Sequence, residues 1–159
     1  MTGDDVTDPE WWAARVRACG GDLQRAQYDG NAGAFAECHA RQMGELRRAG
    51  IKPTDSVLDA GCGYGRLLTL LPAEWKGEYV GVDFCEEFVE IARVIWKGRK
   101  FICHDLADVS SLYRRSADQF DVAVCVWVRT MLVDRGLHDV WETIEGELRK
   151  CARRVVVID

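Results

Sequence analysis

The chain has 159 residues, of which 48% are hydrophobic and 30% are charged, and its formal net charge at pH 7 is −5. This is the composition of one globular domain with a sizeable core. No apolar run approaches the roughly 18 residues that cross a membrane, the acidic N-terminus lacks the apolar core of a signal peptide, and the negative charge argues against general nucleic-acid binding, so we expect a cytoplasmic protein.

The N-terminal third predicts two helices. Asp8-Pro9-Glu10 is typical of a helix start, with an acidic N-cap and a proline in the first turn. Gly20-Gly21 is expected to end this helix, and Tyr28-Asp29-Gly30-Asn31 predicts a turn. A second helix is expected from about Ala32 to Ala49, followed by Gly50.

The stretch from Ser56 to Arg66, SVLDAGCGYGR, organises the rest of the chain. A short apolar strand leads to Asp59, three glycines follow at alternate positions, and Leu67–Leu71 is apolar and helix-like. Glycine accepts positive φ and lets a ligand approach the backbone closely. A helix N-terminus adds free N–H groups beside the turn. The pattern predicts a buried strand, a tight turn and a helix around a nucleotide-like ligand.

Further strands and helices alternate after the glycine turn. The strands are short apolar runs, and the helices show the apolar period of 3.6 residues. In chain order we expect a strand at Tyr79–Asp83, a helix at Phe84–Lys97, a strand at Phe101–Cys103, a loop or short helix at Leu106–Ser116, a strand at Phe120–Val128, a helix from about His138 to Cys151 and a strand at Val155–Ile158.

This alternation predicts an α/β fold, a Rossmann-like three-layer α/β/α sandwich with a mostly parallel five-stranded sheet and N-terminal helices. In such sheets ligands bind at the carboxyl ends of the strands. Asp59, Asp83 and Asp105 follow three of the expected strands, so we expect them on one rim, with Asp83 at an exposed strand end. Taken singly, each acid is also compatible with a helix cap.

The form Asp59-x-Gly61-x-Gly63-x-Gly65, with acids ending two later strands, resembles motif I of the class I S-adenosylmethionine (SAM) dependent methyltransferases. It differs from the dinucleotide fingerprint Gly-x-Gly-x-x-Gly because Arg66 stands where the third glycine would be. The resemblance implies one SAM-binding domain over residues 1–159. Residues 53–159 would form its Rossmann-like core and residues 1–52 a helical lid over the donor, with simple core packing of the N-terminal helices as the alternative.

The resemblance also implies which residues hold the donor. The backbone of the glycine turn would pack against the methionine and ribose, with Asp59 near the methionine amino group. Asp83 would accept from the ribose hydroxyls, Phe84 would cover the adenine, and Asp105 with Leu106 would hydrogen-bond its edge. The full expected set of cofactor-binding residues is Asp59, Gly61, Cys62, Gly63, Asp83, Phe84, Asp105, Leu106 and Val126.

The acceptor is less defined. Methyl transfer is an in-line attack on a sulfonium methyl, so alignment supplies much of the rate, and a base matters only for a protonated nucleophile. His39 and His138 are candidate bases, with a surface or capping role equally open, and no catalytic residue is assigned. The segment Trp127–Met131 is expected to reach the acceptor. It lacks the Asn/Asp-Pro-Pro-Tyr signature of methylation on DNA bases or glutamine, which favours a small molecule, or a protein side chain of another kind, over nucleic acid.

The sequence departs from the resemblance at its end, because the family sheet has seven strands and this sequence stops at the fifth. Val155–Ile158 is then expected to be an apolar sheet edge, which predicts a homodimer through this edge, with a bulge or the N-terminal helices covering it as the alternative. The seven cysteines and three histidines show no ligand spacing, so we expect reduced thiols and no metal site.

Three interpretations of the function remain at this point. The first is a SAM-dependent methyltransferase that acts on a small molecule. The second is a non-catalytic SAM-binding subunit, or one that depends on a partner for activity. The third is a different enzyme on the same fold, such as an aminopropyltransferase or a nicotinamide oxidoreductase, and Arg66 argues against the nicotinamide form.

Overall fold

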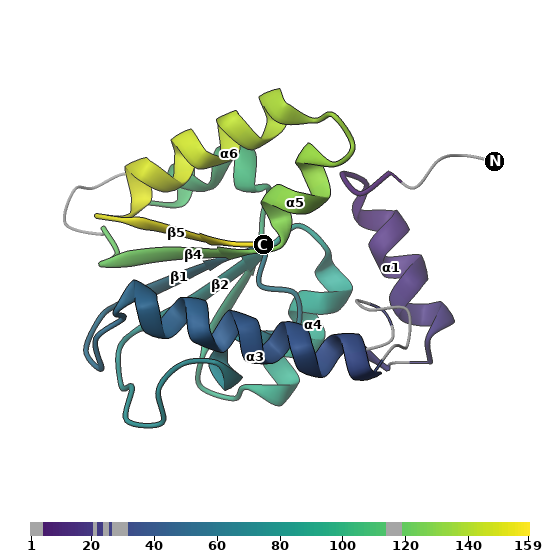
Figure 1. Cartoon of the computed structure of the whole chain (residues 1–159). Helices are drawn as coiled ribbons and strands as arrows, with labels where there is room; N and C mark the ends of the chain where they lie inside the picture. The colour runs from purple at the N-terminus through teal and green to yellow at the C-terminus, as the bar shows by residue number, and fades with distance from the viewer. Residues whose placement is uncertain (1–4, 21, 24–25, 27–31, 114–118) are drawn as a thin grey trace.

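The structure, a computed structural model, describes residues 5–20, 22–23, 26, 32–113 and 119–159. The turn expected at Tyr28–Asn31 lies outside these residues. Figure 1 shows a central sheet between two helical layers, with a further helix beyond the carboxyl ends of the strands. Labels follow Figure 1.

The described residues contain one sheet of five strands, and every neighbouring pair is parallel. The strand order is β3-β2-β1-β4-β5, so the chain moves outward from β1 in one direction and then returns to pair on the other side of it. The sheet confirms the expected Rossmann-like α/β fold. The strands are β1 (Val57–Ala60), β2 (Tyr79–Asp83), β3 (Lys100–Cys103), β4 (Val122–Val126) and β5 (Val155–Ile158).

The helices agree with the expected pattern at most positions. Asp8 caps the first helix, since its side chain accepts from the N–H of Glu10, and Gly50 with φ +62 follows the second. The helical segments are α1 (Pro9–Ala18), α3 (Ala32–Ala49), the 3₁₀ segment η1 (Arg66–Thr69), α4 (Glu86–Ile95), the 3₁₀ segment η2 (Leu106–Leu112), α5 (Val128–Val133) and α6 (His138–Cys151).

Two expected elements differ from the structure. The helix expected after the glycine turn is only the four-residue 3₁₀ segment η1, and Pro72 follows shortly after it. The strand expected at Phe120–Val128 covers only Val122–Val126 and is followed by the short helix α5. Trp127 separates the two elements with φ +68, a left-handed conformation that ends the strand.

Alternate residues of the central strands face two separate cores. On one face, Leu58 and Ala123 pack with α5, α6 and η2, and on the other, Val57 and Val124 pack with α3, η1 and α4. This is the period of two that a sheet covered on both faces requires. A third cluster joins α1 to α4 through Val16 and Phe88. This cluster fixes α1 beyond the carboxyl end of the sheet (Figure 1).

Among the described residues, no helix is long and apolar enough to pass through a membrane. All seven cysteines carry free thiols. Four of them are buried, namely Cys62, Cys85, Cys125 and Cys151.

Candidate functional site

A cavity of about 330 Å³ opens at the carboxyl edge of the sheet. Its lining comes from the ends of β1, β2 and β4, from the loops after β1, β2, β3 and β4, from α4, α5 and α6, and from the segment around α1. The structure brings all nine residues expected from the sequence to this one cavity: Asp59, Gly61, Cys62, Gly63, Asp83, Phe84, Asp105, Leu106 and Val126.

The glycine turn that follows β1 contributes to the lining of the cavity. Gly61, Gly63 and Gly65 have φ of +76, +51 and +83, a backbone region that residues with a Cβ rarely adopt. A Cβ built on Gly61 would lie 2.3 Å from Cγ2 of Val128, which lines the cavity. The turn therefore needs glycine both for its conformation and for the close approach of α5.

Asp83 is only 6% exposed, so the expectation of an exposed strand end is wrong. Its Oδ2 accepts from the N–H of Gly63 at 2.8 Å, and its Oδ1 accepts from the N–H of Cys85 at 3.0 Å. Burial raises the pKa of this carboxyl, and the backbone hydrogen bonds oppose the rise. The side chain joins the end of β2 to the glycine turn while it also lines the cavity.

Asp59 is buried inside β1, at 2% exposure. The hydroxyl of Tyr79 donates to its Oδ2 at 2.5 Å. Burial raises the pKa of Asp59 to about 7, against the opposing effects of the Tyr79 hydrogen bond and the Arg66 charge, with a smaller contribution from Asp83. A buried carboxyl of this kind is a ready partner for a cationic group of a ligand.

The part of the cavity wall that follows β3 in the chain combines an exposed acid with apolar surface. Asp105 caps η2, and its Oδ1 accepts from the N–H of Ala107 at 2.9 Å. The neighbouring Leu106 is buried, and Phe84 is half-buried on the adjacent loop. Both apolar side chains line the cavity beside the Asp105 carboxylate. The wall thus offers a hydrogen-bond acceptor next to apolar contact surface.

Arg66 and Trp127 also line the cavity and were not expected there as binding residues. Arg66 is 8% exposed, its Nη2 donates to Oε1 of Gln42 at 2.5 Å, and its Cζ lies 5.9 Å from the centre of the Trp127 ring. Trp127 belongs to the segment expected to reach the acceptor. Its positive φ is visible only in the structure.

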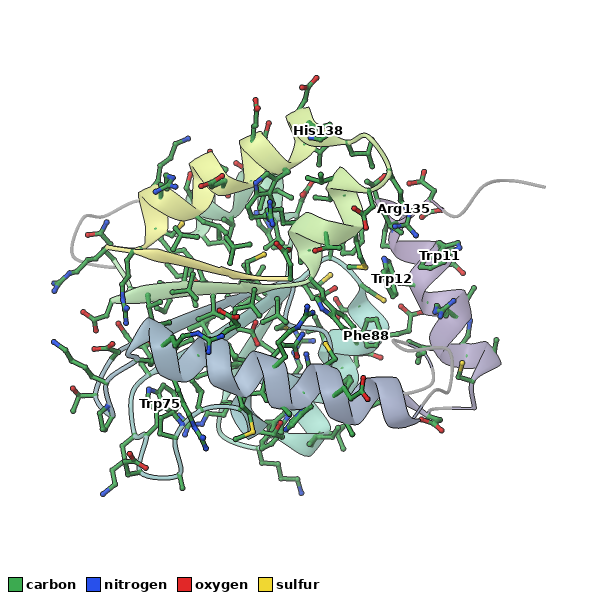
Figure 2. The ribbon with its side chains drawn as sticks, in the orientation of Figure 1. Trp11, Trp12, Trp75, Phe88, Arg135 and His138 are labelled. Atoms are coloured by element: carbon green, nitrogen blue, oxygen red, sulfur yellow. The ribbon has the colours of Figure 1, made fainter. Side chains whose placement is uncertain are left out.

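The side of the cavity away from β1 and β2 is apolar. Trp12 of α1 lies 6.1 Å from Phe88 of α4, ring centre to ring centre, and Figure 2 shows both rings between these helices. The apolar residues on this side are Val6, Trp12, Phe88, Met131, Leu132, Leu137, Val140 and Ile144. Met131 lies in the segment expected to reach the acceptor, and Val6 and Trp12 lie in the expected lid. The others were not identified from the sequence, because an apolar residue that lines a cavity has the same pattern as one in a core.

The two candidate bases do not reach the cavity lining among the described residues. His138 is exposed at the start of α6, and Figure 2 shows it at that end of the helix. His39 is half-buried on α3, and burial together with the nearby Arg66 charge lowers its pKa.

Comparison with known proteins gives a family for this fold. The family model described as "Methyltransferase domain" matches residues 57–151. The Mycobacterium tuberculosis protein Rv1506c, whose name describes a candidate methyltransferase, is 38% identical over 71 residues, which are 42% of this chain and 43% of that protein. The chain therefore matches less than half the length of this relative.

Solved structures share the fold. Magnesium protoporphyrin IX methyltransferase from Synechocystis PCC 6803, with bound SAM, has a TM-score of 0.62 at 22% identity, covering 98% of this chain and 77% of the other. DesVI from Streptomyces venezuelae has a TM-score of 0.61 at 18% identity, covering 87% of this chain and 56% of the other.

Proposed function

We propose that this chain, which belongs to the methyltransferase domain family, binds SAM in the cavity and transfers its methyl group to a small-molecule acceptor. One observation carries the proposal. Nine residues expected to hold the donor come from four strands and the loops that follow them, and they line a single cavity. The family uses SAM as its methyl donor, and the volume of about 330 Å³ is within the range of small-molecule sites.

The chemistry of the lining supports a donor that carries an adenosine. The Asp83 carboxylate has acceptor capacity beyond its two backbone partners, and this suits a ribose diol. The Asp105 carboxylate can accept from an amino group, while Phe84 and Leu106 offer apolar surface to a ring. Asp59 would face the ammonium at the other end of the molecule.

When bound, SAM supplies an activated methyl group on a sulfonium. The residues of this chain would hold the adenosine and amino-acid ends and leave the methyl facing the apolar side of the cavity. Trp12, Met131 and Leu137 on that side favour an acceptor with apolar surface, and they would exclude water from the transfer. With the described histidines outside the lining, we propose that positioning provides most of the catalysis.

Residues 5–18 support the proposal of an N-terminal lid over the donor. Val6, Thr7 and Trp12 line the cavity, and α1 is held by its apolar cluster with α4. The indole N–H of Trp12 donates to the carbonyl of Val6 at 3.1 Å, so this segment is held in place by its own contacts as well. A small acceptor would enter between α1 and α5.

Turnover tests the proposal directly. The chain is incubated with methyl-labelled SAM and a panel of apolar acceptors that carry carboxylate, thiol, amine or hydroxyl groups, and S-adenosylhomocysteine (SAH) and labelled product are measured by mass spectrometry. We expect labelled product from at least one acceptor and loss of it in Asp83→Ala. Tight SAH binding with no turnover on any acceptor would instead favour a SAM-binding subunit that needs a partner.

A further inference from the structure

We propose that Asp159, the residue after β5, is a positioning residue for the acceptor side of the cavity: it holds the outer face of α5 and thereby sets where Met131 lies. The inference rests on the proposed function, because it assumes that the acceptor binds against α5. Asp159 is not among the described residues that line the cavity, so it would act through the helix and not by contact with a ligand.

The segment expected to reach the acceptor is divided between two faces of α5. Val128 and Met131, three positions apart, both line the cavity. Residues at this spacing share one face of a helix. Arg129 and Thr130 lie between them, and both of their side chains donate to the carboxylate of Asp159. Helix α5 therefore presents one face to the cavity and another to the end of β5.

Three side-chain hydrogen bonds converge on Asp159. Oγ1 of Thr130 donates to its Oδ1 at 2.6 Å, Nε of Arg129 donates to its Oδ2 at 2.7 Å, and Nη2 of the same guanidinium also donates to Oδ2. An exposed ion pair alone contributes little, but the Asp159 side chain is only 28% exposed. Charge-assisted hydrogen bonds that share one carboxylate fix the geometry of their donors. These bonds join the start of α5 to the end of β5.

Helix α5 depends on contacts outside itself for its position. It has six residues, whereas helices much shorter than about 12 residues are not stable alone. Its N-cap is Trp127, whose indole cannot accept a capping hydrogen bond. Leu132 is buried in the core near the far end of the helix, but Met131 is only half-buried and faces the cavity. The position of Met131 therefore depends on the contacts that Asp159 makes with the neighbouring residues.

The effect of Asp159 should be confined to the acceptor side. Of the nine residues expected to hold the donor, the one nearest to α5 in the chain is Val126, which belongs to β4. Val128 lies against Gly61 and is held there by the glycine turn. Met131 instead lies on the apolar side, where we propose that the methyl group faces the acceptor. A misplacement of about 1 Å in such a wall can cost about a hundredfold in rate.

NMR of the chain labelled with methyl-¹³C methionine tests the position of α5 directly. The chain has three methionines, and Met131→Leu identifies the Met131 signal. We expect this signal to shift or broaden in Asp159→Ala, which removes all three side-chain hydrogen bonds, and in Thr130→Val, which removes one. The signal of Met43, in the α3-side core, should stay unchanged. If Asp159→Ala folds poorly, Thr130→Val and the milder Asp159→Asn provide the same test.

Turnover and donor affinity give a second measurement. With the acceptor found in the panel, kcat/KM of Asp159→Ala should fall at least about tenfold, while SAH affinity measured by calorimetry stays within about threefold. Asp159→Asn keeps an oxygen that can accept from Thr130, so it should retain more activity. Glu45→Gln is the matched control, because it removes an ion pair with Arg48 on α3, outside the described cavity lining. It should behave as the unaltered chain in every measurement.

The outcomes distinguish this inference from the proposed function. An unchanged Met131 signal in both Asp159→Ala and Thr130→Val would show that Asp159 does not position α5. A loss of SAH affinity as large as the loss of turnover would show a general structural role and would also overturn the inference. If no acceptor of the panel is methylated, the Met131 signal and the SAH affinity decide. If the unaltered chain does not bind SAH, the proposed function itself is wrong.

Discussion

The carboxylate of Asp83 accepts from the backbone N–H of Gly63 at 2.8 Å, and this hydrogen bond ties the end of β2 to the glycine turn of β1. The same side chain lines the cavity, where we propose that it accepts from the donor ribose. Asp83 therefore belongs to the architecture of the site as well as to its recognition of the donor. Variants at this position should alter stability and binding together.

Replacement of Asp83 by alanine leaves the N–H groups of Gly63 and Cys85 without their acceptors. We expect Asp83→Ala to lower the free energy of unfolding by roughly 1–3 kcal/mol, the usual cost of an unsatisfied buried polar group. SAH affinity should fall as well. Urea unfolding and calorimetry measure the two effects. An unchanged urea midpoint in Asp83→Ala would show that these hydrogen bonds do not stabilise the fold.

Asp59 should make stability depend on pH. Burial raises its pKa from 3.8 to about 7, so the folded state holds a proton that the unfolded chain releases. The stabilisation from this group is complete below about pH 4 and is lost as the pH rises through about 7. Asp59→Asn keeps an acceptor for the Tyr79 hydroxyl without the titration.

The difference between the two proteins isolates Asp59 from the other titrating groups. We expect the unfolding free energy of the unaltered chain, relative to Asp59→Asn, to decrease between about pH 4 and about pH 7. Urea titrations at several pH values provide the measurement. A difference that stays constant or rises over this range would contradict a raised pKa.

The role of Gly61 can be tested by comparison with a second glycine that also has a positive φ but has no neighbouring atoms near its Cβ position. A Cβ at Gly61 would lie 2.3 Å from Val128, whereas a Cβ at Gly98, with φ +87, meets nothing within 4 Å. Both alanine variants should lose about 1–2 kcal/mol from the left-handed backbone. Only Gly61→Ala should lose further stability and SAH affinity, because it displaces Val128. Equal effects in the two variants would mean that the close approach to α5 is unimportant.

The β5 edge remains the predicted site of self-association. Ala123 and Trp127 of the β4 side donate to the carbonyls of Arg154 and Ile158, so the N–H groups of the alternate residues Val155 and Val157 point away from β4. We expect a two-fold dimer through this edge. Light scattering at micromolar concentration should show a dimer for the unaltered chain and a monomer for Val157→Pro.

Val157 and Val156 are both half-buried, Val157 against the α6-side core and Val156 against the α3-side core. Val156→Lys would therefore perturb the fold as well as the edge. A monomeric, soluble unaltered chain would show that the β5 edge is covered within one molecule, and the dimer prediction would then be dropped.

Local patterns predicted the elements that have clear boundaries. The helical period defines α6, and polar residues mark the boundary between it and β5. Both elements therefore have the expected spans, His138–Cys151 and Val155–Ile158. Helix α5 was missed because Val122–Val128 is apolar almost throughout, and an apolar run alone does not show where a strand ends. Trp127 has a positive φ that ends strand β4, and no pattern in the sequence indicates this conformation.

The residues of the site also divide into those that the sequence predicted and those that it did not. The three acids could be located because parallel strands bring their carboxyl ends to one edge of the sheet. The burial of Asp83 could not be predicted from the sequence, since it depends on a hydrogen bond to Gly63, 20 residues away in the chain. Arg66 stood out only as a departure from the dinucleotide pattern. Its place in the cavity depends on contacts with Gln42 and Trp127 from distant segments.

Donor binding by the isolated chain tests the central claim most directly. The chain is titrated calorimetrically with SAH. NAD, which also contains an adenosine, is the matched control ligand. The Gly61-x-Gly63-x-Gly65 turn with Asp83 and Asp105 around one cavity predicts saturable binding of one SAH per chain and no binding of NAD. Tight binding of NAD with no heat from SAH would contradict the account.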